Sequence, residues 1–457
     1  MARFSFFRKL TAPGSLLGEA FLENSDGCAG SRRCILGSTV TTGLITTMTA
    51  GVYFTGLLLA MGASESYIGY TTAITSFSGL FQLLTPLLLE RFPRRKSILL
   101  MAKIVYHFLN IIVIGVLPIL PIATPLKLVL FMVTLIALNA INHIATPGIS
   151  AWQMQSLPLE KRGHFYTVSN TGVAVLNKIS AFLAGILLDR FEADGTSAFG
   201  ISPTLTAILL IRAGALVCAV LECCFYAKTK EFPYETASDN TPAGGLRLLA
   251  LPLADKRFMK TISLPVFWGF VVGIVGAYFN IYLLEEVHMS YSLISLGGFI
   301  SMPVALLSTP LWYKAMRKFT WPKLLTVTLL GNAFSYFCNP FITSSTLFIY
   351  FFCIVCGTFF DVCLNVINSN LVYLHMPKAN RTAYFSLFSI LKLLGTFLGN
   401  YTGILFIQLT GSFRFTLFGF SLGNKQYISL LSSALFVALA IWTFSFSRNK
   451  EYNTRIV

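Results

Sequence analysis

Several charged side chains lie inside long apolar segments of this 457-residue chain. Asp361 is the one carboxylate that the sequence places well inside such a segment, and Lys178 and Lys392 lie at comparable depth in two others. A charge in hydrocarbon costs roughly 2.5–3.5 kcal/mol, so it normally faces a cavity or a partner. A buried carboxyl group can take up a proton, and a buried ammonium group attracts an anion. These residues are the first candidates for binding or coupling chemistry.

Asparagine side chains recur in the two halves of the chain. The string LNAIN at 138–142 returns as LNVIN at 364–368, and each copy holds two asparagines three residues apart: Asn139 and Asn142, then Asn365 and Asn368. Residues at this spacing share one face of a helix. An Asn side chain has donors and an acceptor, so each pair suits either a polar solute or hydrogen bonds between helices.

Other elements return in the same order at about half the chain length. GVYF at 51–54 matches GAYF at 276–279, which pairs Tyr53 with Tyr278, and Asn280 follows the second copy. The further matches are Thr85-Pro86-Leu87 with Thr309-Pro310-Leu311, Pro158 and Arg162 with Pro377 and Arg381, and Gly185-Ile186-Leu187 with Gly403-Ile404-Leu405. A long period in so apolar a chain indicates two like halves, which is typical of transporters.

The composition is that of a membrane protein. Hydrophobic residues make up 55% of the chain and charged residues 11%, against about 25% charged residues in soluble domains. We expect an all-α membrane protein with twelve transmembrane helices in two six-helix bundles related by a pseudo-two-fold axis. The twelve apolar stretches are 36–60, 67–89, 97–119, 126–149, 165–188, 203–226, 262–284, 291–313, 323–342, 346–373, 383–408 and 428–446.

The predicted domains follow these stretches. The linker between the bundles contains prolines, glycines and mixed charges, and one short helix is expected in it near 245–253. The boundaries are a cytoplasmic N-terminal segment at 1–33, the N-terminal bundle at 34–226, the linker at 227–261, the C-terminal bundle at 262–447 and a cytoplasmic tail at 448–457.

The net charge of +16 falls on one side of the predicted membrane. Most of the 34 Lys and Arg residues lie at the termini and in alternate loops, whereas the opposite loops hold only Lys127, Arg190, Arg414 and Lys425. By the positive-inside rule the basic side is the cytoplasm, so both termini are expected there and the protein in the cell membrane. This placement explains the charge without nucleic acid as a partner.

Other chemistry finds little support in the sequence. Cys353 and Cys356 form a CxxC, but they lie in an apolar span, where cysteines behave as small hydrophobic residues. The sequence has no Walker motif and no clustered acids of the kind a membrane enzyme needs. We therefore expect no enzyme activity, no cofactor and no metal.

The loop after the second predicted helix carries a family resemblance. It reads Pro86-Leu-Leu-Leu-Glu90-Arg91-Phe92-Pro93-Arg94-Arg95-Lys96. Together with the 6 + 6 helices, the parallel halves and the basic central loop, it resembles the major facilitator superfamily over roughly 35–447. The family's loop reads G-x-x-x-D-R-x-G-R-R; here both glycines are proline and Asp is Glu, while the charge pattern is kept.

This loop has two interpretations. Its charges either set the topology alone, or form a gate in which Glu90 pairs across the domain interface in one state only. The gating residues would be Glu90, Arg91, Arg94 and Arg95.

The resemblance also assigns places to the buried charges. In the resembled fold helices 1, 4, 7 and 10 line a central cavity, and 2, 5, 8 and 11 flank it. Asp361, Lys392 and Lys178 would then face the cavity, with Asp361 serving either coupling or a structural ion pair with Lys392. Lys103 and Arg212 would have structural partners.

The repeated tyrosines have two readings under the same resemblance. Tyr53 and Tyr278 would either face each other across the central axis or pack within their bundles. Further polar candidates inside the spans are Gln82, His107, His143 and Asn177.

The resemblance implies a secondary active transporter that moves a small solute by alternating access. We expect a proton as the coupling ion because one carboxylate is buried, and an organic anion as solute because bases outnumber acids inside the spans. The expected partners are that solute, the proton and the lipid bilayer, with the protein a monomer. Two alternatives stay open: a transporter-like solute receptor and a lipid translocase of the same fold.

Overall fold

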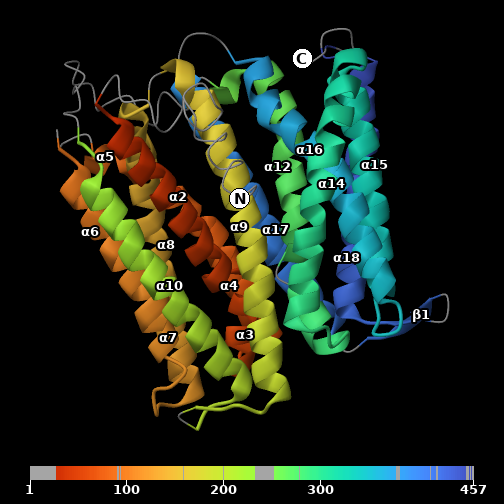
Figure 1. Ribbon diagram of the computed structural model, residues 1–457. Coiled ribbons are helices and arrows are strands. Elements are labelled where there is room, and N and C mark those ends of the chain that lie inside the picture. Colours follow the sequence, from red (N-terminus) through yellow and green to blue (C-terminus); the bar gives the residue numbers. More distant parts are fainter. Residues whose placement is uncertain are drawn as a thin grey trace, which may run out of the picture. The chain divides into compact units, whose positions relative to one another are not determined.

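The chain is helical over most of its length in the computed structural model (Figure 1). Within the described residues, ten helices are long and apolar enough to cross a membrane. The structure describes residues 27–89, 92, 94–157, 159–198, 200–231, 252–276, 278–376, 381–411, 413–417, 420–448, 452 and 454. The short helix predicted near 245–253 and most of the segment predicted at 1–33 therefore lie outside the described residues.

The contacts divide the chain into two compact units. Unit 1 comprises 1–62 and 78–238, and unit 2 comprises 63–77 and 239–457. Residues 63–77, which the sequence analysis assigned to the N-terminal bundle, thus group with the C-terminal one.

The first unit is a set of packed helices in which α10 contacts α2, α6 and α9. Helix α10 begins where the Ser202 side chain accepts a hydrogen bond from the Leu205 amide and Pro203 occupies the first turn, a favourable helix start. The elements are α2 (Ala29–Thr49), α3 (Gly51–Ala60), the 3-10 helix η2 (Gly79–Leu83), α5 (Leu84–Leu89), α6 (Lys96–His107), the π-helix η3 (Phe108–Val113), α7 (Ile114–Val116), α8 (Thr124–Gln155), α9 (Leu159–Ala193) and α10 (Pro203–Lys228).

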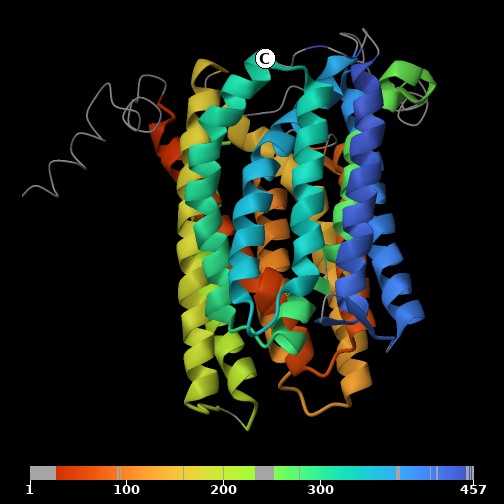
Figure 2. The same ribbon diagram turned by 90° about the vertical axis from the view of Figure 1, so that its right-hand side faces the viewer.

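The second unit has its own bundle, in which α15 packs between α16 and α18 (Figure 2). Helix α14 starts at Ser290, whose side chain accepts from the Leu293 amide. The elements are α4 (Glu65–Ser78), α12 (Lys256–Gly276), α13 (Tyr278–Ile281), the π-helix η5 (Tyr282–Glu286), α14 (Tyr291–Lys318), α15 (Trp321–Cys338), the 3-10 helix η6 (Asn339–Phe341), α16 (Leu347–Leu374), α17 (Arg381–Thr410), β1 (Phe415–Leu417), β2 (Phe420–Leu422) and α18 (Asn424–Ser447).

Helix α4 joins the second unit through polar side chains along its length. The Gln408 amide donates to the hydroxyls of Ser66 at 3.3 Å and Tyr70 at 3.4 Å, and the Asn400 amide donates to Ser76 at 3.0 Å. Ser66 and Tyr70 lie one turn apart on one face of α4, and Ser76 lies near its end. In contrast, the Thr85 hydroxyl in α5 donates to the Ile144 carbonyl in unit 1. The second predicted helix is thus divided between the two units, with the 3-10 turn η2 at the division.

Two predicted spans are not among the ten membrane-length helices. The stretch 67–89 is interrupted by η2, and 323–342 becomes α15 followed by η6, with polar residues such as Asn332 and Ser335 along it. The count of twelve stays a prediction. The sequence analysis also missed a two-stranded antiparallel hairpin, β1–β2, in which Phe415 pairs with Leu422 between α17 and α18.

A glycine seam brings α12 and α17 together closely. Gly395, Gly399 and Gly403 recur every four residues along α17, and a Cβ on each would meet a backbone carbonyl of α12, namely those of Val266, Phe270 and Ile274. Small residues at this spacing let membrane helices approach by their backbones, where dispersion forces are strongest. The sequence of α17 therefore fixes which helix it packs against.

We expect Gly399→Ala to destabilise the protein, because its methyl group would meet the Phe270 carbonyl and no flexible side chain could give way. Overpacking of this kind costs about 1–3 kcal/mol. The thermal unfolding midpoint of the detergent-solubilised chain measures it. Gly172→Ala is the matched control, because a Cβ there meets nothing within 4 Å. Equal midpoints for the two variants would contradict the role of the seam.

Candidate functional site

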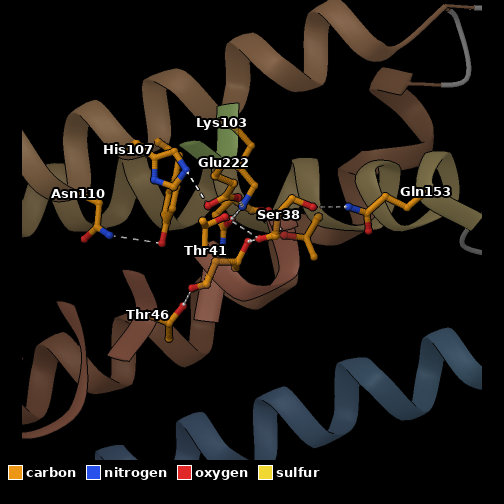
Figure 3. Close-up of polar contacts among 12 residues, drawn as sticks. Ser38, Thr41, Thr46, Lys103, His107, Asn110, Gln153 and Glu222 are labelled. Carbon is orange, nitrogen blue, oxygen red and sulfur yellow. Dashed lines mark hydrogen bonds and ion pairs between the residues drawn. The ribbon is translucent and has the colours of Figure 1, made fainter. Parts of the chain in front are cut away.

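Unit 1 contains a buried charged cluster of Glu222, Lys103 and His107 (Figure 3). Lys103 Nζ lies 3.7 Å from Glu222 Oε1, and His107 Nε2 lies 3.3 Å from Oε2. The exposed fractions are 0% for Glu222, 6% for Lys103 and 4% for His107. Lys103 and His107 are four residues apart in α6, so both side chains project from one face toward α10. We call this group the Glu222 cluster.

Glu222 corrects the sequence analysis, which took Asp361 as the one carboxylate well inside a span. Glu222 was missed because it lies near the end of its predicted span. A signal was present in the sequence. Lys103 lies about two turns inside α6 and Glu222 about two turns before the end of α10, so the two opposite charges lie at a similar distance from these helix ends.

Lys103 has a second polar partner in α8. Its Nζ donates to the Asn142 side-chain oxygen at 3.2 Å. Asn142 belongs to the repeated LNAIN element, so one of the predicted solute-binding residues contacts the Glu222 cluster. The expectation that Lys103 has structural partners is confirmed.

Arg212 is held in the same unit. Its Nη1 donates at 2.6 Å to the Asn110 carbonyl, which lies in the π-helix η3. A π-helix changes the regular hydrogen-bond pattern of the backbone, and a buried carbonyl needs a donor. The expectation of a structural partner for Arg212 is confirmed as well.

In unit 2, Asp361 lies half-buried midway along α16. The side chain of Asn332 in α15 forms a hydrogen bond with the Asp361 carboxylate. The Tyr336 hydroxyl is close enough for the charge of Asp361 to act on it. Lys392 is exposed, with its Nζ 5.8 Å from the centre of the Trp268 ring, a cation–π distance. Among the described ion pairs there is none between Asp361 and Lys392, so the structure does not bring together the pair considered in the sequence analysis.

The repeated asparagines differ between the units. Asn139 and Asn365 each donate to a carbonyl one turn earlier, those of Leu135 and Asp361. The second asparagine of each pair makes different contacts in the two units. Asn142 accepts from Lys103, whereas the buried amide nitrogen of Asn368 has no hydrogen-bond partner in the described structure.

Tyr53 and Tyr278 are both buried within their own units, with exposed fractions of 3% and 1%. The Tyr53 hydroxyl donates to the Ala181 carbonyl in α9. The Tyr278 ring lies against Gly69 of α4, where a Cβ would meet its hydroxyl. Each tyrosine thus contacts a helix of its own unit.

The two remaining solute candidates are less enclosed. Asn280 is half-buried in α13, and Lys178 is half-buried midway along α9.

Of the predicted gating loop, Glu90 and Arg91 lie outside the described residues. Arg95 and Lys96 meet Glu231, whose carboxylate accepts from their backbone amides at 2.6 and 2.8 Å. A carboxylate at this position caps the N-terminus of α6 and favours its dipole. Arg94 precedes this cap. The loop thus joins the start of α6 to the end of α10 inside unit 1, and a gating role for it stays a prediction.

A second charged cluster, which we call the Lys425 cluster, lies in unit 2. Lys425 in α18 has an exposed fraction of 6%, and its Nζ is 2.6 Å from Glu65, 3.0 Å from Glu286 and 3.6 Å from Glu285. One cation thus holds three carboxylates from α4 and η5. The sequence analysis saw Lys425 only as an isolated base in a loop, because the carboxylates come from segments distant in the sequence.

The comparisons with known proteins agree with this helical architecture. A sequence profile described as Major Facilitator Superfamily matches residues 35–400. No relative among curated proteins matches the chain by sequence. Solved structures are similar in fold over nearly the whole chain, at identities too low to transfer a substrate.

Three of these structures illustrate the likeness. A mutant of the nucleoside transporter NupG has a TM-score of 0.66 at 14% identity, covering 91% of this chain and 99% of that one. An inward-facing bacterial homolog of the human lysosomal transporter Spinster has a TM-score of 0.65 at 15% identity, covering 94% and 98%. A D-xylose–proton symporter has a TM-score of 0.65 at 15% identity, covering 93% and 98%.

The fold and the charges inside its spans define a multi-pass membrane transporter. The chain belongs to the Major Facilitator Superfamily, which confirms the resemblance noted in its sequence.

The Lys425 cluster gives a prediction for unit 2. Lys425→Met leaves three carboxylates facing one another, so we expect a lower unfolding midpoint at neutral pH. The loss should be smaller than the roughly 3–5 kcal/mol of a fully buried pair that loses one partner, because the three carboxylates are about one-third exposed. Acid should reduce the loss by neutralising the carboxylates. Arg414→Met, at an exposed base, is the control; equal losses in both variants would show that the cluster adds no stability.

Proposed function

We propose that this protein is a secondary active transporter that moves a small solute by alternating access, driven by a proton gradient. The observation that carries the proposal is the carboxylate of Asp361 in the middle of a membrane-length helix, half-buried and without an ion-pair partner in the described structure. A carboxylate in such a place costs little to protonate and much to keep charged, so it suits proton exchange. The family membership supplies the transport framework.

The proposed architecture is twelve transmembrane helices in two six-helix bundles, with both termini in the cytoplasm of a cell-membrane protein that works as a monomer. The distribution of Lys and Arg supports this orientation. The solute would bind near mid-membrane. Candidate contacts are Asn139, Asn142, Asn365, Asn368, Tyr53, Tyr278 and Asn280.

We further propose an organic anion as the solute. Lys178 lies midway along α9 and Lys392 about one third along α17, and neither has an ion pair in the described part of the chain. An unneutralised ammonium group inside a membrane protein attracts anions by its field. The proposal assigns both lysines to solute binding.

Proton coupling is tested in proteoliposomes of the purified chain. The vesicles are given an imposed proton gradient and supplied with a pooled library of labelled metabolites. Gradient-driven accumulation is expected in the native protein and its loss in Asp361→Asn, because the amide cannot exchange a proton. Glu192→Gln, an exposed carboxylate at the end of α9, should retain accumulation. Flux that is unchanged by the gradient and by Asp361→Asn would refute proton coupling through this residue. Binding of a solute without flux would favour a receptor.

The anion proposal has a separate test in the same vesicles. Lys178→Ala and Lys392→Ala should each lower uptake of anionic solutes by about tenfold or more, because losing a charge-assisted contact costs roughly 1.5–3 kcal/mol. Lys127→Ala is the control, since Lys127 donates to the Pro118 carbonyl near the end of its span. Unchanged anion uptake in both variants, at equal membrane insertion, would exclude these lysines from the site.

A further inference from the structure

The Glu222 cluster has more ionisable groups than a structural ion pair needs. Lys103 and Glu222 carry opposite charges, and His107 adds a third group beside the same carboxylate. All three residues are at least 94% buried, so a change of one proton alters the charge of a site shielded from solvent. Such a change has large electrostatic consequences at low dielectric.

The geometry of the cluster is loose for a structural pair. A buried ion pair is stabilising only with close contacts and further hydrogen bonds to its oxygens. Here the contacts measure 3.3 and 3.7 Å, and none has the geometry of a full hydrogen bond: both Glu222 oxygens and both His107 ring nitrogens lack one in the described structure. The carboxylate of Glu222 is therefore held by the neighbouring basic side chains more than by close hydrogen bonds.

Lys103 is placed between two acceptors. Its Nζ lies nearer the Asn142 oxygen, at 3.2 Å, than the Glu222 carboxylate, at 3.7 Å. A small movement of this long side chain would shift its charge from α10 toward α8. The carboxylate would then have lost its cation, which favours its protonated form.

The other groups around the carboxylate come from four helices, and most of them are uncharged. Helices α2 and α8 direct uncharged side chains to the cluster, Thr42 to Glu222 and Asn142 to Lys103. From α6 the further titratable group is Tyr106, and α10 adds Cys218, Cys223, Tyr226 and Arg212. Of these only Arg212 is a cation, and it is held by the Asn110 carbonyl.

Among the described residues, the hydroxyls of α2 offer the cluster a polar approach. His107 lines a groove of about 440 Å³ between α6 and α10 whose other walls are almost wholly apolar. On the opposite side, α2 presents a series of hydroxyls, with Thr42 half-buried and Thr46 exposed one turn away. Figure 3 shows Ser38, Thr41 and Thr46 along this helix. Hydroxyl groups can both donate and accept, as a proton path requires.

We propose that Glu222, His107 and Lys103 form a proton-binding site in the N-terminal unit. A proton bonds to the Glu222 carboxylate, and Lys103, which stays an ammonium, turns to Asn142. His107 positions the carboxylate. The net charge of the site rises by one, and this charge lies beside an Asn142 that is proposed to contact the solute. Proton binding would thereby attract an anionic solute, and this step rests on the proposed function. The binding of the proton to Glu222 does not rest on it.

The test is infrared difference spectroscopy of the full chain in lipid nanodiscs as the pH is lowered, without any solute. We expect a C=O band of a protonated carboxyl group that is absent in Glu222→Gln and retained in Asp361→Asn. Spectra of the native protein and Glu222→Gln that coincide at every pH would overturn the proposal. The infrared measurement does not depend on transport. A protein that gives the band here but shows no flux in the proteoliposome experiment would disprove the proposed function and leave the proton site standing.

A second variant protects the test if Glu222→Gln fails to fold. In Lys103→Met the carboxylate loses its cation, so the midpoint of the same band should move to higher pH by about one unit or more, whereas Lys127→Met should leave it unchanged. His107→Gln should also move the midpoint while retaining the band, because a positioning residue tunes the site without carrying the proton. A midpoint unmoved in both Lys103→Met and His107→Gln would show that the protonated carboxyl group is not Glu222.

Discussion

The cost of an unpaired polar group in hydrocarbon is the constraint on which this structure depends. Without water, each buried charge and each irregular backbone carbonyl must find a partner inside the protein. Arg212 and the Asn110 carbonyl satisfy two such needs with one hydrogen bond, since the π-helix supplies the acceptor and α10 the donor. The same rule explains why the Glu231 carboxylate accepts hydrogen bonds at the start of α6 and why Lys425 forms ion pairs with three carboxylates. Helix positions in each unit follow these pairings.

Close helix contact is the second organising feature. Hydrophobic burial gives no preference among partners when lipid is as apolar as the side chains, so shape decides. In unit 2 the glycines of α17 admit the carbonyls of α12, which selects one neighbour and one register. In unit 1 Lys103 connects α6 with both α8 and α10 through polar contacts. Close glycine contacts and buried charges therefore both hold helices together.

Repeated residues make different contacts in the two units. Tyr53 and Tyr278 occupy matching positions, yet one donates to a helix carbonyl and the other lies against a glycine of α4. Asn142 contacts a buried lysine, whereas the amide nitrogen of Asn368 is unpartnered in the described structure. A duplicated element thus keeps its place in the fold while its surroundings give it a different chemistry. The proposed division of work follows, with a proton site in one unit and the half-buried Asp361 in the other.

The sequence by itself determined the membrane class, the family, the helical character and the two-fold repeat, because these depend on composition and period, which survive without knowledge of contacts. It also placed Asp361, Lys178 and Lys392 within spans. Only the tertiary structure decided which charges meet. The Glu222 cluster, the Lys425 cluster and the transfer of 63–77 to unit 2 join segments far apart in the chain. Pairing of this kind depends on the distances between helices. The hydrophobic pattern of a sequence indicates how deep in a span a residue lies, but not which residues of other helices lie beside it.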